Sequence, residues 1–164
     1  SRSVRADRLI RSARHLAYFR KAGRAGRARR MVDGMLRNDV AEFAMDYPVT
    51  TEIPFTDPAY TDLLSGFYAE CTRHLCDLAA TGEDIVVLCE GDPFFYGSFM
   101  HLHARLGGRV PVCVVPGLTG RSGAWTASDL PISGGDDVLT VVTATREPVS
   151  GAVPARGHRL HGSL

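Results

Sequence analysis

The residues of this chain whose types and spacing most favour chemistry form an acidic glycine turn, Glu90-Gly91-Asp92-Pro93, directly after an apolar run. Gly91 permits backbone dihedrals that other residues avoid and lets a ligand approach the main chain closely. Pro93 lacks a backbone donor and cannot continue a strand ladder. Such a turn can bind a ligand through backbone groups and offer carboxylates to a cation. It can equally be an ordinary connection between a strand and a helix, because short motifs also match by chance.

The segments around this turn predict an α/β fold. Ile85 to Cys89 is apolar without alternation, which is typical of a parallel strand covered on both faces. Tyr96 to Leu106 predicts the crossover helix that follows, and the apolar runs Val110 to Val115 and Val138 to Thr143 predict two further strands. In open α/β sheets ligands bind beyond the carboxyl ends of the strands, so the turn is the first candidate site.

A second turn of small residues, Pro116 to Gly120, follows the strand predicted over 110–115 and precedes a short predicted helix around Ala124 to Ala127. Right-handed crossovers would place this turn and the turn at 90–93 at the same edge of the sheet. Together the two turns would line a crevice with backbone amides and carbonyls.

The first half of the chain predicts further elements. The clearest is a helix over Asp57 to Gly82, with Asp57 as N-cap and apolar residues three and four positions apart. The others are a helix over Val4 to Arg14, a strand over His15 to Phe19, a short helix over Met31 to Leu36 and an extended edge segment over Phe43 to Ile53.

The composition is typical of one globular domain, with 164 residues of which 45% are apolar and 23% charged. No apolar run approaches the roughly 20 residues that cross a bilayer, and no segment resembles a secretion signal. We therefore expect a cytoplasmic protein without a membrane partner. The four cysteines show no CxxC spacing and are expected to be reduced packing residues, with no metal site; they are Cys71, Cys76, Cys89 and Cys113.

The charge is unevenly distributed. Residues 1–37 contain twelve Lys and Arg against two acidic residues, whereas the rest contains seven basic and sixteen acidic residues. This predicts an anion-facing surface for phosphates, an acidic membrane or a substrate with several carboxylates, and a solvated basic face is the alternative. Residues 1–37 have only Tyr18 and Phe19 as aromatic residues, which argues against a single-stranded nucleic acid as partner.

Residues 91–97 read Gly-Asp-Pro-Phe-Phe-Tyr-Gly, and with them the chain resembles, over approximately residues 4–143, the tetrapyrrole methylases, a family that uses S-adenosylmethionine. Residues 91–97 have the family's GDPxxYG form, and the longer segments Tyr47 to Pro54 and Cys89 to Leu106 resemble the branch that methylates C20 of precorrin-2. The other matching segments are Ala17 to Phe19, Val115 to Thr119 and Gly135 to Thr140.

The resemblance implies methyl transfer to C20 of precorrin-2 or cobalt-factor II in cobalamin biosynthesis, by a homodimer. No catalytic residue can be assigned, since the electron-rich meso carbon of the substrate is itself the nucleophile. The arginine-rich segment after residue 19 is a candidate for binding substrate carboxylates, and the alternative is that its side chains are only solvated. The candidate residues are Arg24, Arg27, Arg29 and Arg30. The family pattern places the cofactor on Gly91, Asp92, Pro93, Tyr96, Gly97, Thr119 and Gly120.

The resemblance also implies a fold: the three-layer, parallel-sheet N-terminal domain of the tetrapyrrole methylases over residues 1–145. Family members begin with a strand and a glycine-rich loop and continue into a second α/β domain, so we expect this domain to be incomplete at its start and the second to be missing. Residues 146–164 lack periodicity and predict a disordered or unrelated tail. Two alternatives stay open, another member of the family such as a precorrin-3B C17-methyltransferase, or an inactive fragment that only binds anions or dimerises.

Overall fold

The structure is a computed structural model that describes residues 2–49, 53–54, 56–129, 131–139 and 141. The chain forms two compact units, residues 1–120 and residues 121–164.

The first unit is built on a three-stranded sheet in the order β2-β1-β3. In the centre, β1 pairs His15 with Ala41 of β2 on one side and with Ile85 of β3 on the other, and both pairings are parallel. The carboxyl ends of the three strands therefore lie at one edge of the sheet. The strands are β1 (His15–Lys21), β2 (Ala41–Tyr47) and β3 (Ile85–Leu88).

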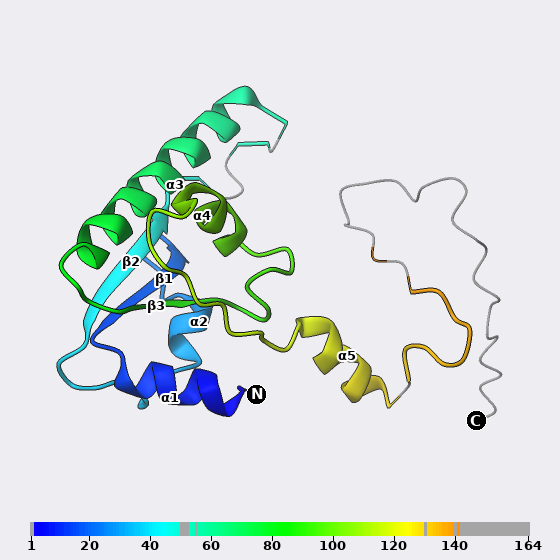
Figure 1. The fold of residues 1–164 in the computed structure, drawn as a ribbon. Coiled ribbons are helices and arrows are strands. Elements are labelled where there is room, and N and C mark those ends of the chain that lie inside the picture. The colour runs from blue at the N-terminus through cyan, green and yellow to red at the C-terminus, as the bar shows by residue number, and fades with distance from the viewer. Residues whose placement is uncertain (1, 50–52, 55, 130, 140, 142–164) are drawn as a thin grey trace. The chain divides into compact units, whose positions relative to one another are not determined.

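Helices cover both faces of this sheet, as Figure 1 shows, with α1 and α2 on one face and α3 and α4 on the other. Side chains alternate along a strand, so Leu16 and Tyr18 of β1 pack in the first layer of core and Ala17 packs in the second. The predicted three-layer α/β fold is confirmed. The helices are α1 (Val4–Ser12), α2 (Arg27–Arg30), α3 (Pro58–Ala79) and α4 (Phe99–Leu106).

The long helix α3 begins where the sequence predicts. The Asp57 carboxylate accepts a hydrogen bond from the backbone N–H of Ala59 at 2.9 Å, which satisfies one of the unpaired donors of the first turn. The buried face of α3 is narrower than the spacing of apolar residues predicts, as the 44% exposure of Leu63 shows. The buried residues of α3 are Tyr68, Cys71, Thr72 and Leu75.

The helix predicted over residues 31–36 is wrong. These residues form turns, and the short helix α2 lies just before them. Gly34 has φ +73°, a conformation that ends a right-handed helix. Val32 is nevertheless buried in the first core layer. The extended segment predicted over 43–53 is confirmed as β2 up to Tyr47, and residues 50–52 lie outside the described residues.

The strand predicted over residues 110–115 is also wrong, because no described residue of this run belongs to a strand. Pro111 removes a ladder donor inside the run. Val114 still packs on the second core layer, whereas Cys113 is exposed and is not the core residue that we expected. For the strand predicted over 138–143, residues 138, 139 and 141 are not in a strand, and the others lie outside the described residues.

The second unit contains α5 (Gly120–Ser128), which confirms the helix predicted around residues 124–127 and has no buried residue. The predicted tail, 146–164, lies outside the described residues, so the boundary at 145 stays a prediction. Among the described helices, none combines the length and the apolar character that crossing a membrane requires.

Candidate functional site

The strand order of the sheet reverses between β1 and β3. The chain passes from β1 outward to β2 and then crosses back to β3 on the opposite side of β1. The connection after β1 leads to α2 on one face, whereas the connection after β3 leads to α4 on the other. Such a reversal is the position at which open α/β sheets bind ligands, beyond the carboxyl ends of the two strands. Two segments begin there, the arginine loop (residues 21–30) after β1 and the glycine turn (residues 90–93) after β3.

The glycine turn lies against the second turn (residues 116–120), as the sequence predicts. A Cβ on Gly117 would overlap the carbonyl oxygen of Gly91 and would lie 2.7 Å from its carbonyl carbon. Gly91 has φ +74°, and a Cβ there would lie 3.3 Å from the carbonyl oxygen of Leu118. The backbones of the two turns therefore meet without side chains between them, and glycine is required at both positions.

The Asp92 carboxylate joins the two turns. One oxygen, Oδ1, accepts a hydrogen bond from the backbone N–H of Phe94 at 2.9 Å, and the other, Oδ2, accepts one from the backbone N–H of Gly117 at 3.0 Å. The Asp92 carbonyl also accepts a hydrogen bond from the backbone N–H of Phe95 at 3.1 Å. Asp92 thus links its own turn to Gly117, which lies 25 residues further along the chain.

The segment after the glycine turn presents aromatic side chains to solvent. Phe94, Phe95 and Tyr96 are 48%, 40% and 75% exposed. Tyr96 has φ +55°, a conformation that costs a residue with a side chain about 1–3 kcal/mol and is concentrated at functional sites. The next residue, Gly97, packs closely against Pro93, since a Cβ on Gly97 would lie 3.4 Å from the Pro93 carbonyl oxygen.

The far end of this segment is anchored to β2. The Tyr47 hydroxyl hydrogen-bonds to Oγ of Ser98, which precedes α4, and its ring stacks on Phe19 with the ring centroids 5.5 Å apart. Burial raises the pKa of Tyr47, so the hydroxyl keeps its proton and can donate it to Ser98. Sequence reasoning missed this contact because its partners are 51 residues apart and only the fold brings them together.

Arg29 fixes the arginine loop to the sheet. Its Nε and Nη2 donate to the two carboxylate oxygens of Glu42 at 2.7 and 2.8 Å, and its Nη1 donates to Asp33 at 2.5 Å. These hydrogen bonds raise the pKa of Arg29 and lower that of Glu42. The loop lies close to β1 at Gly26, where a Cβ would be 2.8 Å from the carbonyl oxygen of Phe19. A paired guanidinium of this kind is a structural brace.

The other three arginines of the loop are exposed. Arg27 is 78% exposed, and its Nη1 lies 3.9 Å from Oε2 of Glu90, so the arginine loop lies beside the glycine turn. Within the part of the chain that the structure describes, Arg24 and Arg30 have no ion-pair partner. Three exposed guanidinium groups of the arginine loop are therefore accessible to an anionic ligand, and that of Arg27 lies next to the glycine turn.

The described residues include no group of three or more His, Cys, Asp and Glu side chains that could hold a metal ion. Burial raises the pKa of the Cys71 thiol to about 11 and that of the Cys89 thiol, directly before the glycine turn, to about 12. Both thiols stay protonated at neutral pH and are weak nucleophiles.

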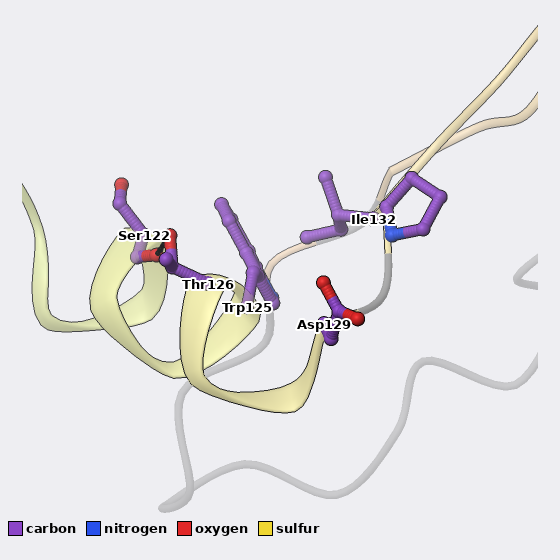
Figure 2. Close-up of a pocket in the computed structure, with 6 residues that line it drawn as sticks. Ser122, Trp125, Thr126, Asp129 and Ile132 are labelled. Atoms are coloured by element: carbon purple, nitrogen blue, oxygen red, sulfur yellow. Dashed lines mark hydrogen bonds between the residues drawn. The ribbon is translucent and has the colours of Figure 1, made fainter.

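The second unit has an open hollow of its own beside α5 (Figure 2). No predicted site residue lines it. Its lining consists of Ser122, Trp125, Thr126, Asp129, Pro131 and Ile132.

The structure therefore brings the predicted cofactor residues together at one place. Gly91 lies against Thr119 and Gly120, because a Cβ on Gly91 would be 3.6 Å from the Thr119 Cα and 3.9 Å from the Gly120 nitrogen. Asp92 and Pro93 belong to the same turn, and residues 96 and 97 follow it. Their contact with a cofactor stays a prediction.

Comparison with known proteins identifies the family. The family model of the tetrapyrrole (corrin/porphyrin) methylases matches residues 3–160. The chain belongs to this family. The predicted resemblance is confirmed, and tetrapyrrole methylases use S-adenosylmethionine as methyl donor.

Individual relatives include proteins of cobalamin biosynthesis. The chain is 47% identical over 143 residues to a precorrin-2 C(20)-methyltransferase of Sinorhizobium sp, which covers 87% of this chain and 58% of that protein. It is 38% identical over 143 residues to the cobalamin biosynthesis protein CobIJ of Mycobacterium bovis, which covers 87% of this chain and 28% of that protein. The chain therefore spans only part of the length of these relatives.

A solved structure has the same fold. The cobalt precorrin-4 methyltransferase CbiF matches with a TM-score of 0.59 and 18% sequence identity, over 90% of this chain and 54% of that chain. At this identity the match supports the fold alone.

Proposed function

We propose that this chain carries the cofactor-binding face of a tetrapyrrole C-methyltransferase, and that the reaction is methyl transfer from S-adenosylmethionine to C20 of precorrin-2 or of cobalt-factor II. One observation carries the proposal. The glycine turn and the second turn meet beside the arginine loop, at the reversal of strand order. The 47% identity to a precorrin-2 C(20)-methyltransferase supports the choice of substrate.

The two turns fit the cofactor because their main-chain groups meet without side chains between them. Bound S-adenosylmethionine supplies an electrophilic methyl group on a sulfonium. In this proposal the main-chain groups of Gly91, Pro93 and Gly120 hold and orient it, and Glu90 offers a carboxylate near its positive charge. Tyr96 and Gly97 continue this surface, with the exposed ring of Tyr96 available to cover the ligand.

The arginine loop provides the substrate contact. Precorrins carry a ring of carboxylates, and guanidinium groups bind carboxylates by forked hydrogen bonds. Arg24, Arg27 and Arg30 are accessible for this role. We assign Arg29 a different one, because its three donor nitrogens already bind Glu42 and Asp33. It holds the loop in the conformation that presents the other three side chains.

Catalysis in this site rests on alignment. The meso carbon of the substrate is the nucleophile, so the chain needs no activated Ser or Cys and must hold that carbon in line with the methyl group while excluding water. The protonated state of Cys89 fits this view. The homodimer and the cytoplasmic location expected from the resemblance and the composition stay predictions, and light scattering of the purified chain tests the first.

A labelled-methyl assay tests the proposed reaction. The chain is incubated with S-adenosylmethionine carrying a ¹³C methyl group and with precorrin-2, and the product is examined by NMR. We expect a labelled methyl group at C20. Label at C17 would favour a C17-methyltransferase instead. Absence of labelled product, while S-adenosylhomocysteine binds, would restrict the chain to cofactor binding and contradict the catalytic part of the proposal.

A further inference from the structure

We propose that Asp92 is a positioning residue, whose carboxylate fastens the second turn to the glycine turn and sets the spacing of the two backbones. This inference rests on the proposed function for the identity of the ligand that the turns hold. It assigns Asp92 a role distinct from that of the backbone groups around it, which contact the cofactor in the proposal above.

The hydrogen bonds of Asp92 carry the inference. Both carboxylate oxygens accept from backbone N–H groups of the protein, one from Phe94 at 2.9 Å and one from Gly117 at 3.0 Å. A carboxylate with both oxygens engaged in this way has a fixed position relative to both turns. The neighbouring Glu90 differs, because its side chain is 53% exposed and pairs with Arg27 at 3.9 Å. The Glu90 carboxylate is therefore paired with a charged side chain at the surface, whereas the Asp92 carboxylate is held by main-chain donors.

The packing of the turns shows why such a link matters. The Gly117 backbone lies so close to Gly91 that a Cβ on Gly117 would overlap the Gly91 carbonyl oxygen. Two backbones with no side chains between them gain little from apolar packing. The charge-assisted hydrogen bond from the Gly117 N–H to Asp92 supplies a directional attraction at this contact. A change of spacing here would move Thr119 and Gly120, which lie against Gly91.

The first arm of the test uses the protein without ligand. Asp92→Asn keeps the size of the side chain and one acceptor oxygen, but its NH₂ group cannot accept the second hydrogen bond. We expect amide hydrogen exchange to accelerate by about tenfold or more at Gly117 or at Phe94, whichever N–H faces the NH₂ group, the effect of losing a hydrogen bond to a charged group. Asp62→Asn is the matched control, because Asp62 is an exposed residue of α3. Unchanged exchange at both Gly117 and Phe94 in Asp92→Asn would overturn the proposal.

The second arm separates positioning from direct contact. S-adenosylmethionine carries a sulfonium charge, whereas S-adenosylhomocysteine has an uncharged sulfur. If Asp92 positions the turns, Asp92→Asn weakens the binding of both molecules by the same factor, about tenfold. A clearly larger loss for S-adenosylmethionine would show a charge contact and overturn the positioning role. If the unmodified chain binds neither molecule, the proposed cofactor is wrong, and the exchange arm still decides whether Asp92 links the turns.

Discussion

The glycine turn and the arginine loop follow neighbouring strands, yet they are built in opposite ways. The glycine turn offers main-chain groups, and its shape depends on the close approach of Gly91 and Gly117. The arginine loop offers charged side chains, and its shape depends on the pairing of Arg29 with Glu42. A binding surface made of main-chain groups loses its ligand when a side chain is inserted. A binding surface made of charged side chains loses its ligand when charge is removed or screened by salt. The two regions should therefore respond to different perturbations.

The largest expected effect is on the glycine turn. Gly117→Val places a branched side chain where even a Cβ overlaps the Gly91 carbonyl oxygen, so the turns must separate. We expect the affinity for S-adenosylhomocysteine, measured by isothermal titration, to fall more than about a hundredfold, since relieving such an overlap moves backbone. The control is Gly66→Ala in α3, where a Cβ meets nothing within 4 Å. This change should stabilise the helix by up to about 1 kcal/mol and leave the affinity unchanged. Wild-type affinity in Gly117→Val would refute the backbone-built site.

Charge removal should affect the arginine loop alone. We expect replacement of Arg24, Arg27 and Arg30 by Gln to weaken binding of a polycarboxylate porphyrin by about tenfold or more, because each lost exposed ion pair contributes up to about 1 kcal/mol. Fluorescence titration measures this affinity, which in the unmodified chain should fall with added salt. Binding of S-adenosylhomocysteine should stay unchanged. Arg8→Gln in α1 is the control, and an equal loss in that variant would assign the effect to general charge.

Removing the brace should destabilise the loop. Arg29→Ala leaves Glu42 without its ion pair, and we expect the free energy of unfolding in urea to fall by about 1–2 kcal/mol. The folded-state pKa of Glu42 is below its usual 4.5, so this carboxylate contributes stability above that value and loses it as the pH falls through the folded pKa. The stability difference between the two proteins should therefore shrink below about pH 4.5. A difference independent of pH would contradict the pairing. Arg29→Lys should restore only part of the lost stability, because lysine lacks the two parallel N–H donors with which a guanidinium group binds a carboxylate.

The smallest effect is expected at the anchor of the glycine turn segment. Tyr47→Phe removes the hydrogen bond to Ser98 and keeps the ring that stacks on Phe19. We expect the free energy of unfolding in urea to fall by about 0.5–1.5 kcal/mol, the usual net contribution of one hydrogen bond. Tyr60→Phe at the start of α3 is the matched control and should change little. If the two variants are equally stable, the hydroxyl of Tyr47 does not anchor the segment.

Local signals predicted most of the first unit from the sequence. Asp57 at a helix start and the uninterrupted apolar run before Glu90 each determine their element through nearby residues. The run 110–115 has the same apolar character, but Pro111 interrupts the donors that a ladder needs. Val114 of this run still packs against the second core layer, where it is partly buried, because packing needs no paired neighbour whereas a strand does.

The roles within the candidate site were harder to predict. Arg29 and Arg30 are adjacent residues of the same type, so the sequence does not distinguish their roles. The fold places Glu42 and Asp33 against Arg29. The glycine at 117 could be predicted as part of a turn, while its approach to Gly91 depends on how two distant connections meet. Contacts between segments far apart in the sequence leave no local pattern to interpret.

The central claim is that the paired turns hold the cofactor. Amide hydrogen exchange of the unmodified chain, with and without saturating S-adenosylhomocysteine, tests it most directly. We predict that protection is concentrated in residues 90–97 and 116–120, while α1 and the outer face of α3 are unaffected. Saturable binding without protection of these two segments, or with protection confined to the arginine loop, would contradict the claim.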